Sequence, residues 1–207
     1  MNVKITEDPR IDPRIKSLFG AMPSMAPRED AVSRTQLLEA ANTEESLAAR
    51  QGIKTFMDTS DTEEIAPSAG LSIRTESFTS APDGNAIKIN YIRPDNDEKL
   101  ACVYYIHGGG MQSMSCFDGN YRAWGKIIAA CGVAVAMVDF RNCMIASSGA
   151  EVEPFPAGLS DCVAGVKWVH ANACALNIDS ERIIICLLYT SPSPRDQRGG
   201  RVAGYGC

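Results

Sequence analysis

Two apolar runs on either side of an amphipathic segment constrain the fold of this 207-residue chain more than any other feature. Residues 100–106 and 133–138 contain no charged side chain, which is typical of strands that helices cover on both faces. Between them, apolar residues recur at three- and four-residue spacing, which predicts a helix; they are Tyr121, Trp124, Ile127, Ile128 and Cys131. The order strand, helix, strand predicts a parallel sheet built from right-handed crossovers.

The flanking segments extend this α/β pattern in both directions. A second helix is predicted by the apolar stripe Leu159, Cys162, Val163, Val166, Val169 and Ala173, and a short buried strand by residues 183–185. Residues 71–93 alternate apolar and polar side chains around the turn sequence Pro82-Asp-Gly-Asn85, which predicts a hairpin with one wet face. The expected fold class is therefore α/β, a mostly parallel sheet with an N-terminal antiparallel hairpin.

Composition and charge exclude several classes of function. The net charge of -5 gives no footprint for nucleic-acid binding. The charge-free stretch 127–138 is too short for a membrane span, and the N-terminus has no secretory apolar core. None of the eight cysteines has zinc-site spacing with a histidine or another cysteine, so we expect reduced thiols and no metal. A cytoplasmic location without membrane or nucleic-acid partners is the default expectation.

The two ends of the chain depart from the α/β pattern. Asp8-Pro-Arg-Ile is repeated at once as Asp12-Pro-Arg-Ile, which predicts helix starts with proline in the first helical position. A further helix is predicted from Asn42 towards Phe56, with Glu45 as its capping-box partner. We therefore expect residues 1–65 to form a helical arm or cap, and 66–185 to form the sheet domain. Residues 186–207 turn to serine, proline, glycine and arginine, and we expect a disordered tail that is foreign to the domain.

The segment His107-Gly108-Gly109-Gly110 directly follows the first apolar strand. Ligands of α/β sheets bind beyond the carboxyl ends of the strands. Three glycines there allow a sharp turn that exposes backbone N–H groups, and two such groups aimed at a carbonyl oxygen form an oxyanion hole. The alternative is a flexible turn without chemistry.

Four motifs in order resemble the hormone-sensitive-lipase-like esterases of the α/β-hydrolase superfamily. They are Tyr105-Ile-His-Gly-Gly-Gly-Met111, Val138-Asp-Phe-Arg141, Pro154-Phe-Pro-Ala157 and Asn177-Ile-Asp-Ser-Glu-Arg-Ile183. The resemblance implies hydrolysis of a small carboxylic ester by a Ser-Asp-His triad, without a cofactor. It assigns the oxyanion loop to Gly108, Gly109 and Gly110, and a loop-shaping role to His107. It leaves the oligomeric state open.

The family's nucleophile motif is missing from these 207 residues. No Gly-x-Ser-x-Gly occurs, the expected serine position falls on Tyr189, and no histidine follows His170. The sequence from Cys186 to Asp196 resembles a translated sequencing adaptor. We therefore expect a chain without nucleophile, triad aspartate or triad histidine, which is inactive as given.

Other residues are weaker catalytic candidates. Ser113 and Ser115 follow the glycines, and Ser191 and Ser193 lie in the tail, but none is on a nucleophile elbow. We expect His170 to be packed or at the solvent edge. Asp139 and Asp161 precede the expected serine, and we expect them to be structural partners of backbone groups or of Arg141. Two other classes stay open: a non-catalytic, receptor-like relative that binds a small molecule, and an unrelated interaction module.

Overall fold

The computed structural model describes residues 6–19, 31–81, 83–149 and 151–188. It divides into two compact units, residues 1–34 and 35–207. The adaptor-like segment from Tyr189 onward, with Ser191 and Ser193, lies outside the described residues.

In the first unit, only the second Asp-Pro copy begins a helix, α1 (Pro13–Phe19). The carboxylate of Asp12 accepts hydrogen bonds from the backbone N–H and the guanidinium of Arg14. Asp8 makes the same pair of bonds with Arg10, but in a turn. The expected helix at the first copy is wrong because a residue that precedes proline, here Asp12, disfavours helical backbone.

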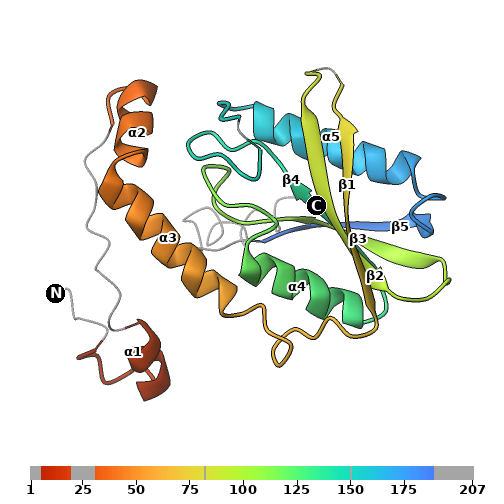
Figure 1. Cartoon of the computed structure of the whole chain (residues 1–207), viewed down its shortest axis with the longest axis horizontal. Coiled ribbons are helices and arrows are strands. Elements are labelled where there is room, and N and C mark those ends of the chain that lie inside the picture. The colour runs from red at the N-terminus through yellow and green to blue at the C-terminus, as the bar shows by residue number, and fades with distance from the viewer. Residues whose placement is uncertain (1–5, 20–30, 82, 150, 189–207) are drawn as a thin grey trace, which may run out of the picture. The chain divides into compact units, whose positions relative to one another are not determined.

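The second unit contains a five-stranded sheet with the order β1-β2-β4-β3-β5 (Figure 1). Its strands are β1 (Leu71–Thr79), β2 (Ala86–Pro94), β3 (Leu100–Ile106), β4 (Ala134–Asp139) and β5 (Ile178–Leu187). β1 and β2 form the predicted antiparallel hairpin, and β2 pairs antiparallel with β4. β3 pairs in parallel with both β4 and β5. The predicted fold class is confirmed.

Helices α4 (Gly119–Ala130) and α5 (Ala157–Ala171) lie on opposite faces of this sheet (Figure 1). Their existence follows the prediction, but part of each predicted apolar stripe faces solvent: Trp124, Ile127 and Cys131 on α4, Leu159 and Val163 on α5. The reason is that each helix approaches the sheet most closely at a glycine. A side chain at Gly125 would lie 2.5 Å from the Met137 sulfur, and Gly165 packs directly against the Tyr104 hydroxyl. The helices therefore meet the sheet along glycine rather than along their largest side chains.

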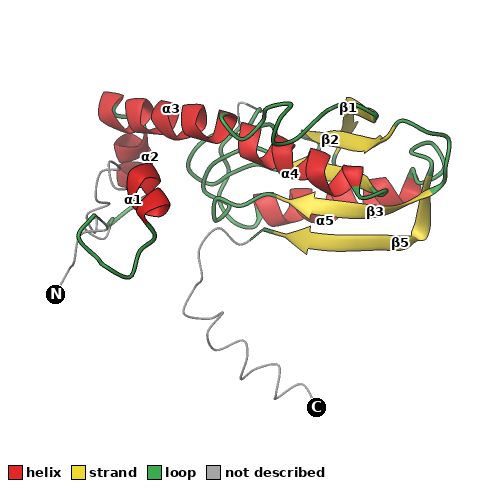
Figure 2. Cartoon of the chain, turned by 90° about the horizontal axis from the view of Figure 1, so that it is seen from below, coloured by secondary structure: helices red, strands yellow, loops and turns green. Residues whose placement is uncertain are grey.

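Strand β5 forms one edge of the sheet within the described residues (Figure 2). It is longer than the predicted strand 183–185 and includes Cys186 and Leu187, which the sequence analysis assigned to the tail. The expectation that this strand is buried is wrong, because Ile184 is 66% and Ile185 59% exposed. Only β3 pairs with this strand in the described part of the chain, so both of its faces keep apolar surface open to solvent.

Helices α2 (Arg34–Ala41) and α3 (Glu44–Asp58) precede the sheet within the second unit. α3 is capped by Thr43 and not by Asn42 as predicted. The Thr43 hydroxyl oxygen accepts the N–H of Ser46, whereas the Asn42 side-chain amide donates to the carbonyl of Leu38. None of the helices in the described part of the chain is long and apolar enough to cross a membrane.

Candidate active site

The loop that follows β3 has a backbone that only glycine adopts easily. Gly109 has φ +106° and Gly110 φ +63°, and Met111 continues the turn at φ 57°. A Cβ built on Gly109 would overlap the carbonyl oxygen of Ser113, whereas one on Gly110 would meet nothing within 4 Å. Gly109 is therefore required for two reasons, its dihedral angle and its close contact with the loop ahead.

His107 fixes the start of this loop from the core. Its ring stacks on Phe140 with a centroid distance of 4.2 Å, and its exposure is 1%. Its Nδ1 lies 2.7 Å from the carbonyl oxygen of Gly108, a contact that assigns the proton to Nδ1. Burial lowers the pKa of His107 below its ordinary value, so the ring is neutral. These contacts agree with a loop-shaping role, which stays a prediction.

The N–H groups of the three glycines differ in their surroundings. Within the described residues, those of Gly109 and Gly110 donate no hydrogen bond. The N–H of Gly108 faces the hydroxyl of Tyr121, whose pKa burial raises to about 12. That hydroxyl donates to the Met114 sulfur at 3.1 Å. The open donors of this loop are thus at Gly109 and Gly110.

A second loop, residues 142–148, braces the glycine-rich loop. The N–H of Cys143 donates to the carbonyl of Met111, and that of Ile145 to the carbonyl of Gln112. Because these bonds hold the segment just beyond the glycines, the two loops form one rigid layer over the ends of β3 and β4.

Asp139, at the end of β4, ties this layer to the sheet. Its Oδ1 accepts the hydroxyl of Ser115 at 2.6 Å. Its Oδ2 accepts both the N–H and the hydroxyl of Ser148, at 3.0 and 2.5 Å. Asp139 is 7% exposed, so this buried carboxylate is satisfied by three hydrogen bonds and positions both loops.

A cavity of about 470 Å³ lies between α3 and these two loops. Its walls are six residues of α3, five of the segment 113–118 and four of 145–148. The glycines do not line it, but Ser113, Met114 and Ser115 begin its wall three residues beyond Gly110. An apolar cavity whose wall continues from a loop with open N–H donors has the general layout of a ligand-binding site.

The alternative serine nucleophiles lack a base. The hydroxyl of Ser115 donates to Asp139 and accepts the N–H of Phe117. Neither His107, stacked on Phe140, nor His170, exposed at the end of α5, makes a hydrogen bond to Ser113 or Ser115 in the described structure. These serines are therefore structural or cavity-wall residues.

Asp161 forms a different buried network, which involves Arg141 as predicted. It is fully buried and accepts the backbone N–H, Nε and Nη2 of Arg141 at 2.8–2.9 Å. It also accepts the side-chain amide of Asn85 from the hairpin turn. Asp161, Asp83 and the hydrogen bonds they accept raise the pKa of Arg141. This network fixes the start of α5 and does not face the cavity.

Comparisons with known proteins agree with the resemblance found in the sequence. The BD-FAE family model matches residues 90–187. The solved esterase Est22 is 62% identical, with a TM-score of 0.85 over 90% of this chain and 54% of that chain. A brefeldin A esterase, described as a bacterial homologue of human hormone-sensitive lipase, is 27% identical, with a TM-score of 0.67 over 87% of this chain and 48% of that chain. The chain is thus similar, in sequence and in fold, to esterases of the hormone-sensitive-lipase-like α/β-hydrolases.

A curated carboxylesterase has a similar relation to the chain. Carboxylesterase NlhH of Mycobacterium tuberculosis is 27% identical over 177 residues, which cover 86% of this chain and 47% of that protein. The chain thus spans about half the length of Est22, the brefeldin A esterase and NlhH.

Sequence reasoning missed two parts of this candidate site. The first is the contribution of α3 to the cavity wall, although Leu47, Lys54 and Met57 recur at helical spacing and indicated one face. The second is the partner set of Asp139, since Ser115 and Ser148 lie in loops without any periodic pattern.

Proposed function

We propose that this chain is the oxyanion-loop and substrate-pocket part of a carboxylic-ester hydrolase that works by acyl transfer. The observation that carries the proposal is Gly109: a glycine-only backbone whose N–H has no partner among the described residues, in a loop that continues into the wall of a largely apolar cavity. The family relation to esterases adds independent support.

In the proposed mechanism, a serine attacks the ester carbonyl, a histidine accepts its proton, and an aspartate orients that histidine. Negative charge develops on the carbonyl oxygen of the tetrahedral intermediate. The N–H groups of Gly109 and Gly110, and that of Gly108 once the Tyr121 hydroxyl yields its place, donate to this oxygen. Donors held in advance stabilise the transition state because they need no reorganisation as the charge forms.

We further propose that the 207-residue polypeptide itself does not turn over esters. It contains no Gly-x-Ser-x-Gly segment, and His107 and His170 are not placed to activate a serine. In a well-studied serine protease, losing the nucleophile or its base costs about 10⁶ in kcat. The remaining oxyanion donors, worth about 10²–10³ each, do not offset such a loss.

Hydrolysis of p-nitrophenyl acetate tests both statements. Est22 has been solved with p-nitrophenol, so this leaving group suits a related site. The chain alone is expected to match an albumin control. Residues 1–185 joined to the C-terminal half of Est22 are expected to hydrolyse the ester in a serine-reagent-sensitive way.

Two results contradict the proposal. Serine-reagent-sensitive activity of the 207-residue chain would return attention to Ser113 and Ser115. A folded chimera that binds ester but never turns it over would favour the non-catalytic, receptor-like alternative.

A further inference from the structure

Arg50 is the cation of the cavity wall without a carboxylate partner in the described part of the chain. The charged residues of the wall are Arg50, Lys54 and Asp118. Lys54 Nζ lies 3.2 Å from Asp118 Oδ1 and 3.8 Å from Asp58 Oδ2. Arg50 instead donates from one guanidinium nitrogen to the neutral carbonyl oxygen of Ala41. The wall therefore carries one uncompensated positive charge.

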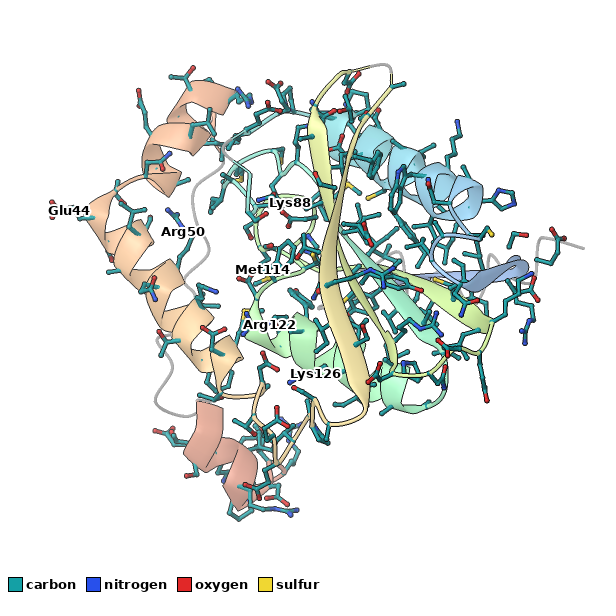
Figure 3. All side chains as sticks on the ribbon, turned by 45° about the vertical axis from the view of Figure 1, so that its right-hand side comes forward. Glu44, Arg50, Lys88, Met114, Arg122 and Lys126 are labelled. Carbon is teal, nitrogen blue, oxygen red and sulfur yellow. The ribbon has the colours of Figure 1, made fainter. Side chains whose placement is uncertain are left out.

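Most of the remaining wall is apolar. Leu47, Ile53 and Met57 come from α3, and Met114, Phe117 and Ile145 from the two loops opposite. Figure 3 labels Arg50 on α3 and Met114 on one of these loops. A charge beside apolar walls is poorly screened by water, so its attraction for an opposite charge is stronger than on an open surface.

A buried carboxylate on the loop side, that of Asp139, is already satisfied. It accepts three hydrogen bonds from Ser115 and Ser148, which line the cavity, whereas Asp139 does not. It therefore does not take the place of a counter-ion for Arg50.

We propose that the cavity selects esters that end in a free carboxylate beyond an apolar chain, and that Arg50 binds this carboxylate. The inference rests on the proposed function for the location of the substrate pocket. The guanidinium presents paired N–H donors that match the two oxygens of a carboxylate, and such charge-assisted bonds are about twice as strong as neutral ones. The apolar chain of the ester covers Leu47, Ile53 and Met57.

A matched pair of probes isolates the charge: monoethyl adipate, which carries one carboxylate, and diethyl adipate, which carries none. Their binding to the 207-residue chain is measured by ligand-observed NMR titration at neutral pH, which needs no turnover. The unaltered chain is expected to bind the monoester about tenfold more tightly than the diester, the effect of one charge-assisted pair. High salt is expected to weaken only monoester binding.

Three variants assign the preference to Arg50. Arg50→Gln is expected to remove the preference for the monoester while leaving the affinity for the diester unchanged. Arg50→Lys keeps a charge and is expected to retain part of the preference. Lys167→Gln, which removes one positive charge from an exposed position of α5 outside the cavity wall, is the matched control and is expected to keep it.

The outcomes separate this inference from the proposed function. Equal affinity for the two probes in the unaltered chain overturns it, as does binding of neither. The inference is also overturned if Arg50→Gln lowers the affinity for both probes equally and monoester binding does not depend on salt. Arg50 would then only support the structure through its hydrogen bond to Ala41. An inactive chimera combined with Arg50-dependent monoester binding rejects the esterase proposal and leaves the carboxylate site standing.

Discussion

Replacing Gly109 by alanine tests whether this one backbone position supports the oxyanion hole. At φ +106° an L-residue is strained, and its Cβ would overlap the carbonyl oxygen of Ser113 and lie 3.3 Å from Cγ of Met114. The carbonyls of Gln112 and Met114, on either side of Ser113, accept hydrogen bonds from the loop 142–148. Because Ser113 is held between them, the backbone at residue 109 must move, by about 1 Å. Displacements of that size reduce rates by on the order of 10²-fold, and loss of one oxyanion donor costs about 10²–10³ in kcat.

The assay is kcat for p-nitrophenyl acetate in the chimera of residues 1–185 with the C-terminal half of Est22. Gly132→Ala is the matched control, because Gly132 has φ +89° but nothing within 4 Å of its added Cβ, and it lies in the turn after α4. Both variants carry left-handed strain of about 1–2 kcal/mol, and Gly109→Ala adds the overlap with Ser113, so thermal melts establish that both variants are folded at the assay temperature. Only Gly109→Ala is expected to lose 10²-fold or more in kcat. If its kcat equals that of Gly132→Ala, the proposed donor is not at Gly109.

Three further predictions follow from other parts of the second unit. Arg93 is 5% exposed and donates only to neutral oxygens around the ends of β2 and α5. Because lysine has fewer donors, Arg93→Lys is expected to lower the free energy of unfolding in urea by about 1–3 kcal/mol. A loss no larger than that of the surface change Arg74→Lys would refute this. Burial lowers the pKa of His107, so below about pH 6.5 the unfolded state binds a proton that the folded state does not, and the free energy of unfolding decreases as the pH is lowered. In His107→Gln this part of the pH dependence of stability is expected to vanish, and an unchanged dependence would contradict the prediction. The exposed edge strand is expected to drive self-association seen by sedimentation velocity; Ile185→Lys lowers it, whereas Leu159→Lys on α5 does not, and equal effects would place the contact elsewhere.

Strands β1 to β4 were predictable because each has its own pattern. Residues 100–106 are apolar on both faces, and β3 has the predicted bounds, Leu100–Ile106. The helices were predictable only in position. The side of α4 that meets the sheet depends on how closely Gly125 approaches Met137 and Ile92. This is a distance between segments that are far apart in sequence, and the periodicity of one segment does not reveal it.

The same distinction holds at the site. The glycine-rich loop was predicted from residue type and its place after a buried strand, whereas the cavity needs α3 and two irregular loops to meet. Nothing in the local sequence distinguishes Arg50, one of two basic residues of α3, from an arginine in open solvent. Its lack of a carboxylate partner becomes visible only when Lys54 and Asp118 are seen to pair with each other.

The sheet topology explains why Asp139 holds this site together. β3 and β4 are parallel, and their register pairs Ile106 with Val138. The next residues, His107 and Asp139, therefore leave the sheet side by side at its carboxyl edge. The first leads into the glycines, and the second accepts hydrogen bonds from the loops on either side of the cavity. The glycine-rich loop and the cavity wall are thus positioned by one pair of neighbouring strand ends, so a change that loosens Asp139 disturbs both together.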